Sequence, residues 1–222
     1  MKIEKLTPNQ VAENIILGKY IYNSDEYGEA VNRIGYLNNL NQPIEIVKKM
    51  ANSDDFCVLC AFAFIISETH SRDLLPIHNE LKPIIRQVLA KNCYRANFDL
   101  IDTFAFFIEN NLADTNDYLV YLNLINSDNY IIQFISISNL LNFNDVILQE
   151  LNQLSDFNIA MELPNLIDKE WFNSITQGKS LSEILIALTL IYRFYGDKAL
   201  ILELYDKQNP YLFDFVNIYL FR

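Results

Sequence analysis

A five-residue motif that occurs three times constrains the fold of this chain more than any other feature. It begins with Asn-Ser-Asp and ends on an aromatic residue, and an apolar run follows each copy. Each run is long enough for a helix of roughly three to four turns. A fourth, degenerate copy precedes the run that matches best, in which residues 55–66 align with residues 97–108. The intact copies and the degenerate one are Asn23–Tyr27, Asn52–Phe56, Asn126–Tyr130 and Arg95–Phe98.

Asn, Ser and Asp are residues that end one helix and begin the next. Asn tolerates the left-handed backbone that follows a helix, and Ser or Asp caps the next helix by accepting its free N–H groups. Acidic side chains favour the positive end of that helix, and the aromatic residue begins its buried face. Apolar runs also precede the intact copies. The repeated unit is therefore predicted to be helix, tight turn, helix, with a period of about 30 to 40 residues that is typical of helical repeats.

A polar turn centred on Asp, followed by a helix with small and aliphatic residues at fixed positions, resembles the HEAT-type α-helical repeat. The resemblance covers residues 9–142, and the Pro and Arg that the family usually carries are missing from all four copies. It implies an all-α fold, a HEAT-like α-solenoid of stacked antiparallel helix pairs. We expect a single domain over residues 1–222, in which residues 143–222 form a less regular helical continuation or cap.

The apolar periodicity predicts helices along most of the chain. After the helix that ends near Ser67 we expect an irregular stretch, Glu68–Asp73, and a helix that is interrupted by Pro76 and restarts near Pro83. A loop is expected at Met161–Pro164. The expected helices are Asn9–Tyr22, Glu26–Asn38, Ile44–Met50, Asp55–Ser67, Asp99–Asn110, Asp114–Ile125, Tyr130–Asn142, Val146–Leu154, Asp168–Thr176, a helix from Ser180 to Gly196, one capped by Asp197 and one that begins at Pro210.

Charge and composition narrow the classes of partner and the location. The 222 residues carry a formal charge of −11 and a sequence pI of about 4.6. Nucleic-acid binders normally present a basic groove, so we expect no nucleic acid as a ligand and favour a basic protein partner, although acidity also simply aids solubility. There is no signal-peptide pattern and no apolar run long enough for a membrane span. Three cysteines suit a reducing compartment, so the protein is expected to be cytoplasmic, with no membrane partner.

No catalytic motif, cofactor-binding motif or metal site is recognisable. The Cys57-x-x-Cys60 spacing lies within a predicted helix and lacks the second ligand pair that a structural zinc site needs, so these thiols are expected in the core. His70 and His78 occur without a nucleophile partner or a second metal ligand. We therefore expect no catalytic residue, no cofactor and no metal.

Alignment of the predicted second helices separates a core face from a variable stripe. The alignment columns that contain Phe56, Leu59, Ala63 and Ile66 hold apolar residues in nearly every copy. The columns on the opposite side of the helix mix acidic and aromatic residues. In helical solenoids the second helices line the concave surface, where partners bind. Alternatively, Phe64 simply packs against neighbouring helices. The residues predicted to bind a partner are Asp54, Asp55, Phe64, Glu68, Asp99, Asp102, Phe106 and Asn110.

These features favour a non-catalytic protein-binding module. As a small acidic protein with helical repeats, this chain resembles bacterial immunity proteins of the contact-dependent growth inhibition or polymorphic toxin type. The resemblance implies that the protein neutralises a cognate toxin domain, a basic nuclease, through an acidic surface. Two alternatives remain open: an adaptor or scaffold subunit, and a ligand-pocket enzyme on the same scaffold. The apolar stretch Tyr211–Phe221 would suit permanent assembly or dimerisation, and the oligomeric state is not predicted.

Overall fold

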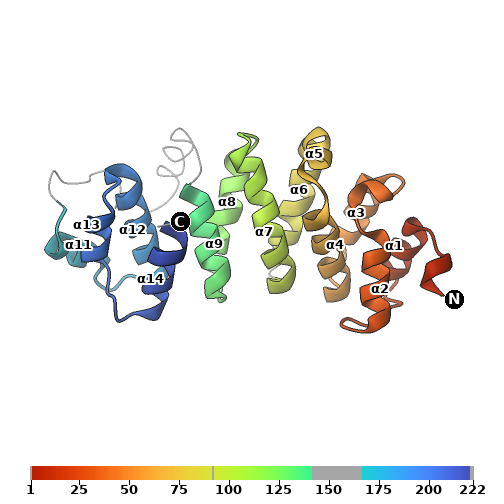
Figure 1. The fold of residues 1–222 in the computed structure, drawn as a ribbon, viewed down its shortest axis with the longest axis horizontal. Helices are drawn as coiled ribbons and strands as arrows, with labels where there is room; N and C mark the ends of the chain where they lie inside the picture. Colours follow the sequence, from red (N-terminus) through yellow and green to blue (C-terminus); the bar gives the residue numbers. More distant parts are fainter. Residues whose placement is uncertain (1, 92, 142–166, 221–222) are drawn as a thin grey trace. The chain divides into compact units, whose positions relative to one another are not determined.

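The computed structural model describes residues 2–91, 93–141 and 167–220, and every regular element among them is helical (Figure 1). The all-α fold class is therefore confirmed for these residues. The helix expected at Val146–Leu154 and the loop expected at Met161–Pro164 lie outside them. The chain divides into two compact units, Met1–Leu112 and Ala113–Arg222. The expectation of one continuous domain stays a prediction.

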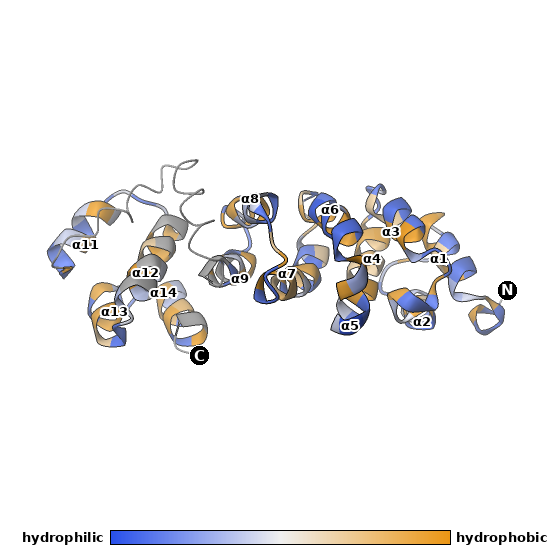
Figure 2. Ribbon diagram, turned by 90° about the horizontal axis from the view of Figure 1, so that it is seen from above, coloured by the Kyte–Doolittle hydropathy of each residue, from blue (hydrophilic) through white to orange (hydrophobic). Residues whose placement is uncertain are grey.

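Three helix pairs and a few short helical turns make up the first unit. The pairs form two layers: α1, α3 and α6 contact one another in order, as do α2, α4 and α7, and each helix also contacts its pair partner (Figure 2). The paired helices are α1 Pro8–Ile16 with α2 Asp25–Ile34, α3 Pro43–Ala51 with α4 Phe56–Glu68, and α6 His78–Leu89 with α7 Tyr94–Glu109. The short elements are η1 Ile3–Lys5, η2 Leu37–Asn39, α5 Ser71–Leu74 and η3 Leu75–Ile77.

Helix α4 is the core of the first unit. It packs against α1, α2, α3 and α7, and its residues from Val58 to Ala63 are all buried, as are Ile65 and Ile66. A helix surrounded on most sides by other helices must be apolar around most of its circumference. The composition of α4 therefore follows from its position.

The repeated motif forms the same turn in two of its copies. The Ser53 hydroxyl accepts a hydrogen bond from the Asp55 N–H at 3.1 Å, and the Asp55 carboxylate caps α4 by accepting from the N–H groups of the second and third helical residues at 2.8 and 3.2 Å. Ser127 and Asn129 repeat this arrangement at the start of α9, with distances of 3.2 Å and then 3.0 and 3.4 Å. In both copies the motif begins a helix, as its residues predicted.

The other two copies are built differently from these two, and the first of them has the left-handed Asn and the capping Ser that were predicted. In the first, Ser24 caps α2 by accepting from the Tyr27 N–H at 3.1 Å, and Asn23 adopts the left-handed conformation with a φ of 63°. In the degenerate copy, α7 begins at Tyr94, before the predicted start at Asp99, and Cys93 is its N-cap. Asn97 is buried inside the helix and donates to the Leu89 carbonyl at 3.2 Å. The predicted start at Asp99 was wrong because the degenerate motif lies inside α7 and does not precede it.

Two helix ends and one helix start also differ from the prediction. Helix α1 ends at Ile16 and α2 at Ile34, because Gly18 and Gly35 follow with φ values of 67° and 66°. Helix α6 begins at His78 and continues through Pro83. The Glu68–Asp73 stretch is more regular than expected, since α4 includes Glu68 and α5 begins at Ser71.

In the second unit, α8 packs against α9, and α9 also contacts α12 and η5. Asp114 and Asp117 form a capping box at the start of α8, and Asp168, Asp197 and Asn209 cap later helices. The elements are α8 Thr115–Leu124, α9 Tyr130–Leu141, α11 Lys169–Thr176, α12 Leu181–Tyr195, α13 Lys198–Leu204, α14 Pro210–Phe215 and the π-helical turn η5 Val216–Leu220. None of the helices described in either unit combines the length and apolarity that a membrane crossing needs.

Candidate functional site

One side of α7, together with its C-cap Asn110, faces solvent and carries half of the predicted binding residues. Successive residues of an α-helix are about 100° apart, so residues spaced three, four, seven and eleven apart share a side. The opposite side is buried and includes Leu100, Phe104 and Phe107. We call the exposed or half-buried side the α7 face; its residues are Arg95, Phe98, Asp99, Asp102, Phe106, Glu109 and Asn110.

Asp99 is a half-buried acid between two helices. Its carboxylate lies 3.7 Å from the Arg95 guanidinium, one helical turn earlier, and 20% of its side chain is exposed. Burial raises the pKa of Asp99, Arg95 lowers it, and the carboxylate of Glu68 on α4 raises it further. Packing of α4 against α7 therefore brings two of the predicted acids, Glu68 and Asp99, within electrostatic range of each other.

Asp102 lies near the centre of the α7 face. The residue is exposed as a whole, yet partial burial of its carboxyl group raises its pKa. Among the described residues no cation forms an ion pair with it. Since burial without a cation disfavours the charged form, a positive group brought by a partner would stabilise the carboxylate.

Phe106 and Asn110 complete the C-terminal part of the α7 face. Phe106 is half-buried, with its ring centroid 5.7 Å from that of Phe107. The Asn110 side-chain amide donates to the Phe106 carbonyl at 2.8 Å. The Asn110 side chain therefore satisfies a carbonyl in the last turn of α7, and only its second amide N–H and its carbonyl oxygen are available to a partner.

The predicted residues on α4 fall into two groups at opposite ends of that helix. Phe64 is half-buried and Glu68 is exposed at the C-terminal end. Asp54 and Asp55 lie at the other end, about 18 Å away for a helix of 13 residues. Asp54 forms an ion pair with Lys91 at 2.7 Å, and Asp55 caps α4. Both acids are therefore already engaged at the N-terminal end of α4, apart from Phe64 and Glu68.

Two exposed aromatic residues on α7 were missed by the sequence analysis. Tyr94 is 61% exposed and Phe98 is 41% exposed, although Phe98 was expected to begin a buried face. The Tyr94 ring centroid lies 6.3 Å from that of Phe56, which in turn lies 4.8 Å from that of Tyr22. The earlier start of α7 turns Phe98 outward. If the helix had been predicted to begin after Cys93, the i, i+4 spacing of Tyr94 and Phe98 would have placed both rings on one side of it.

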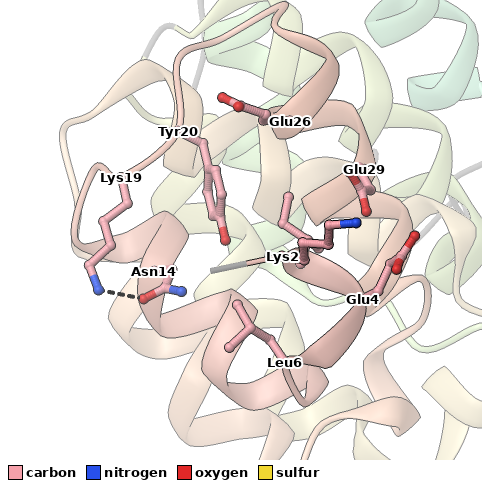
Figure 3. A pocket seen from close by; sticks show the side chains of 9 residues that line it. Lys2, Glu4, Leu6, Asn14, Lys19, Tyr20, Glu26 and Glu29 are labelled. Atoms are coloured by element: carbon pink, nitrogen blue, oxygen red, sulfur yellow. Dashed lines mark hydrogen bonds between the residues drawn. The ribbon is translucent and has the colours of Figure 1, made fainter.

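A separate hollow of about 690 Å³ lies in the N-terminal part of the first unit (Figure 3). The Lys19 ammonium in its wall donates to Asn14 Oδ1 at 2.7 Å. The lining mixes cations, carboxylates and one phenol, without a nucleophile beside a general base. It is lined by Lys2, Ile3, Glu4, Leu6, Asn14, Lys19, Tyr20, Glu26 and Glu29.

The histidines and cysteines do not assemble a metal centre in the part of the chain that the structure describes, where no group of three or more His, Cys, Asp or Glu side chains could hold an ion. His70 stacks on Tyr36 with centroids 5.4 Å apart, and His78 Nδ1 lies 2.7 Å from the Leu75 carbonyl. Cys57, Cys60 and Cys93 are free thiols.

Comparison with known proteins identified no relative of this chain. No protein-family model, no curated protein sequence and no solved structure matches it.

Proposed function

We propose that the first unit is a short HEAT-like α-solenoid whose second helices α2, α4 and α7 form one layer, with the binding surface on α7 and the C-terminal end of α4. The two layers of paired helices support this proposal, since each layer continues from one pair to the next. Helix pairs of this kind bury their apolar faces by stacking on neighbouring pairs.

We infer that the protein is a non-catalytic binding module and that it holds a basic protein against the α7 face. The observation that carries this inference is the partly buried Asp102 carboxyl, which has a raised pKa and forms no ion pair among the described residues. Asp99 and Glu68 add negative charge beside it, and Phe98 and Phe106 flank it on the same side of the helix. An acidic centre with aromatic neighbours suits an Arg- or Lys-rich partner.

The specific form of this proposal is an immunity protein that neutralises a nuclease-type toxin. A nuclease must present a cationic cleft to bind the phosphate backbone. An acidic helical surface can occupy such a cleft and block it without any chemistry of its own. The net charge of −11 favours rapid association with a cationic protein. Such a complex would form in the cytoplasm, where the toxin acts.

Co-expression tests the immunity proposal directly. The C-terminal region of the open reading frame next to this gene in its source genome is expressed alone and with this protein. We expect a small basic domain that stops growth when expressed alone, rescue of growth by this protein, and a stoichiometric complex in a pull-down. If only housekeeping subunits or no proteins are captured, and growth is not rescued, the immunity proposal is wrong.

A matched pair of charge reversals then tests the position of the site. Asp99→Lys with Asp102→Lys should abolish rescue, because both substitutions place cations on the α7 face. Glu26→Lys with Glu29→Lys makes the same change in net charge on an exposed part of α2 and should preserve rescue. Equal loss in the two double variants would show that net charge matters and the α7 face does not.

An adaptor or scaffold subunit is a second candidate, favoured by apolar side chains on the last helices. Tyr211 is 44% exposed, Phe213 48% and Ile218 40%. Exposed apolar side chains can pack into an interface with another chain. Light scattering separates the two candidates: a stable oligomer that dissociates on Phe213→Ser favours assembly, and a monomer favours a conditional partner.

A further inference from the structure

Two phenylalanine side chains bracket Asp102 on the α7 face. Phe98 precedes Asp102 by four residues and Phe106 follows it by four, so the Cβ atom of each lies about 6 Å from that of Asp102. Phe98 is 41% exposed and Phe106 is half-buried. Side chains on an α-helix lean toward its N-terminus, so Asp102 leans toward Phe98, and Phe106 leans toward Asp102. The centre of the α7 face is therefore one acid between two aromatic residues.

Asp102 differs from Asp99 in what it can still bind. The Asp99 carboxylate already lies 3.7 Å from the guanidinium of Arg95. Arg95 precedes Asp102 by seven residues, about 10 Å along the helix axis, and among the described residues no cation forms an ion pair with Asp102. Of the two aspartates, Asp102 is thus the one open to a cation from a partner.

A guanidinium suits this arrangement better than an ammonium. The guanidinium of arginine is planar, donates two parallel N–H groups to a carboxylate and stacks on an aromatic ring. The ammonium of lysine is a compact and strongly hydrated charge without a plane to stack. The net charge of −11 attracts both cations. The aromatic neighbours of Asp102 are therefore the feature that distinguishes between them.

We propose that the α7 face selects arginine over lysine in its partner, with one guanidinium paired to Asp102 and stacked against Phe98. This inference rests on the proposed function, since it names the side chain by which the basic partner is held on the α7 face. Phe106, whose ring centroid lies 5.7 Å from that of Phe107, covers the other side of Asp102. Asp102 thus supplies the charge, and Phe98 determines the specificity.

Two peptides of equal length and charge, hexaarginine and hexalysine, test this preference without the natural partner. Each peptide is titrated at low salt into the isotopically labelled full chain, and the amide chemical shifts report both the affinity and the location of binding. We expect hexaarginine to bind about fivefold more tightly, the ratio that one cation–π contact at an exposed site provides. The largest shifts should occur at residues 98–106.

Three substitutions assign the preference to its residues. Phe98→Leu removes an exposed ring, so most of the advantage of hexaarginine should be lost while hexalysine binds as it does to wild type. Tyr94→Leu is the matched control: it removes a ring that is 61% exposed on the same helix, but about 12 Å before Asp102 along the axis, and should keep the wild-type ratio. Asp102→Asn should weaken the binding of both peptides. Amide spectra that are unchanged outside α7 establish that each variant is folded.

The possible results separate this inference from the proposed function. Hexalysine that binds the α7 face as tightly as hexaarginine would overturn the selection of arginine and leave the basic partner in place. A preference that survives Phe98→Leu, or that Tyr94→Leu removes equally, would overturn the role of Phe98. If neither peptide shifts residues 98–106, the α7 face does not bind basic chains and both proposals are wrong.

Discussion

At the residue scale, neighbouring acids in the repeated motif have different roles. Asp55 accepts two backbone N–H groups and begins α4, whereas Asp54 lies in solvent and pairs with Lys91. The motif predicts that an acid or amide caps the helix, but it does not say which one. That choice depends on Ser53, which fixes the turn by accepting from the Asp55 N–H.

The capping role predicts unequal effects of two alanine substitutions. Asp55→Ala should lower the free energy of unfolding by about 1 kcal/mol, because two N–H groups of α4 lose their acceptor. Asp54→Ala should have a smaller effect, since it removes only an exposed ion pair. Chemical denaturation of both variants measures the difference. A larger loss in Asp54→Ala would contradict the assignment of the cap.

The raised pKa of Asp102 predicts a pH-dependent stability change. Burial disfavours its charged form. The stability that protonated Asp102 provides is therefore fully present below the pKa of Asp in the unfolded chain, near 3.8, and is lost as the pH rises through the pKa of Asp102 in the folded protein. Asp102→Asn should therefore stabilise the protein relative to wild type at pH 7 and lose this advantage near pH 3. Thermal unfolding at both pH values tests this.

Asp54 provides a control of opposite sign. Lys91 lowers the pKa of Asp54. The stability that ionised Asp54 provides is therefore present above the pKa of Asp in the unfolded chain, near 3.8, and is lost as the pH falls through the pKa of Asp54 in the folded protein. Asp54→Asn should thus be destabilising at pH 7 and neutral at low pH. The same pH trend in the two asparagine variants would show that burial of Asp102 and the ion pair between Asp54 and Lys91 do not determine the two pKa values.

At the element scale, Gly28 and Gly35 provide a matched test of α2 and its end. Gly28 lies inside α2, and a Cβ there would have no neighbour within 4 Å. Gly35 ends the helix with a φ of 66° and a ψ of −83°, a conformation that side chains disfavour, and a Cβ there would meet the Asn39 side chain at 3.4 Å.

We expect Gly28→Ala to stabilise the protein by about 0.5–1 kcal/mol, because Ala loses less backbone entropy than Gly in a helix. Gly35→Ala should destabilise it by about 1 kcal/mol or more, because φ must remain positive. Equilibrium unfolding in urea compares the two variants. Stabilisation by both substitutions would mean that α2 continues past Ile34.

The start of α7 shows which parts of the fold could be predicted. The capped helices α2, α4 and α9 follow from Ser24, Asp55 and Asn129, since these side chains act locally. Cys93 makes no side-chain capping bond to the backbone of α7, and Asn97 bonds to the end of α6 instead. Such contacts depend on packing between helices, which local sequence patterns do not contain.

The same limit applies to the candidate site. The exposed stripe of Asp99, Asp102 and Phe106 was predictable from helical periodicity. The proximity of Glu68 to Asp99 was not, because it joins α4 to α7.

At the scale of the whole molecule, the α7 face and Glu68 belong to one compact unit, residues 1–112. This unit has its own buried core around α4. A fragment of residues 1–112 should therefore keep a helical circular-dichroism spectrum and bind the basic partner with the affinity of the full chain. A folded fragment that does not bind would assign part of the site to residues 113–222.

The association rate constant with the basic partner, measured at several salt concentrations, tests the central claim most directly. Wild type and the Glu26→Lys, Glu29→Lys variant should associate rapidly, with rates that fall as salt rises. The Asp99→Lys, Asp102→Lys variant should associate at least about tenfold more slowly, with a weaker salt dependence, because the charges that steer the partner are reversed at the site itself. Unchanged kinetics in that variant would contradict the assignment of the α7 face as the binding surface.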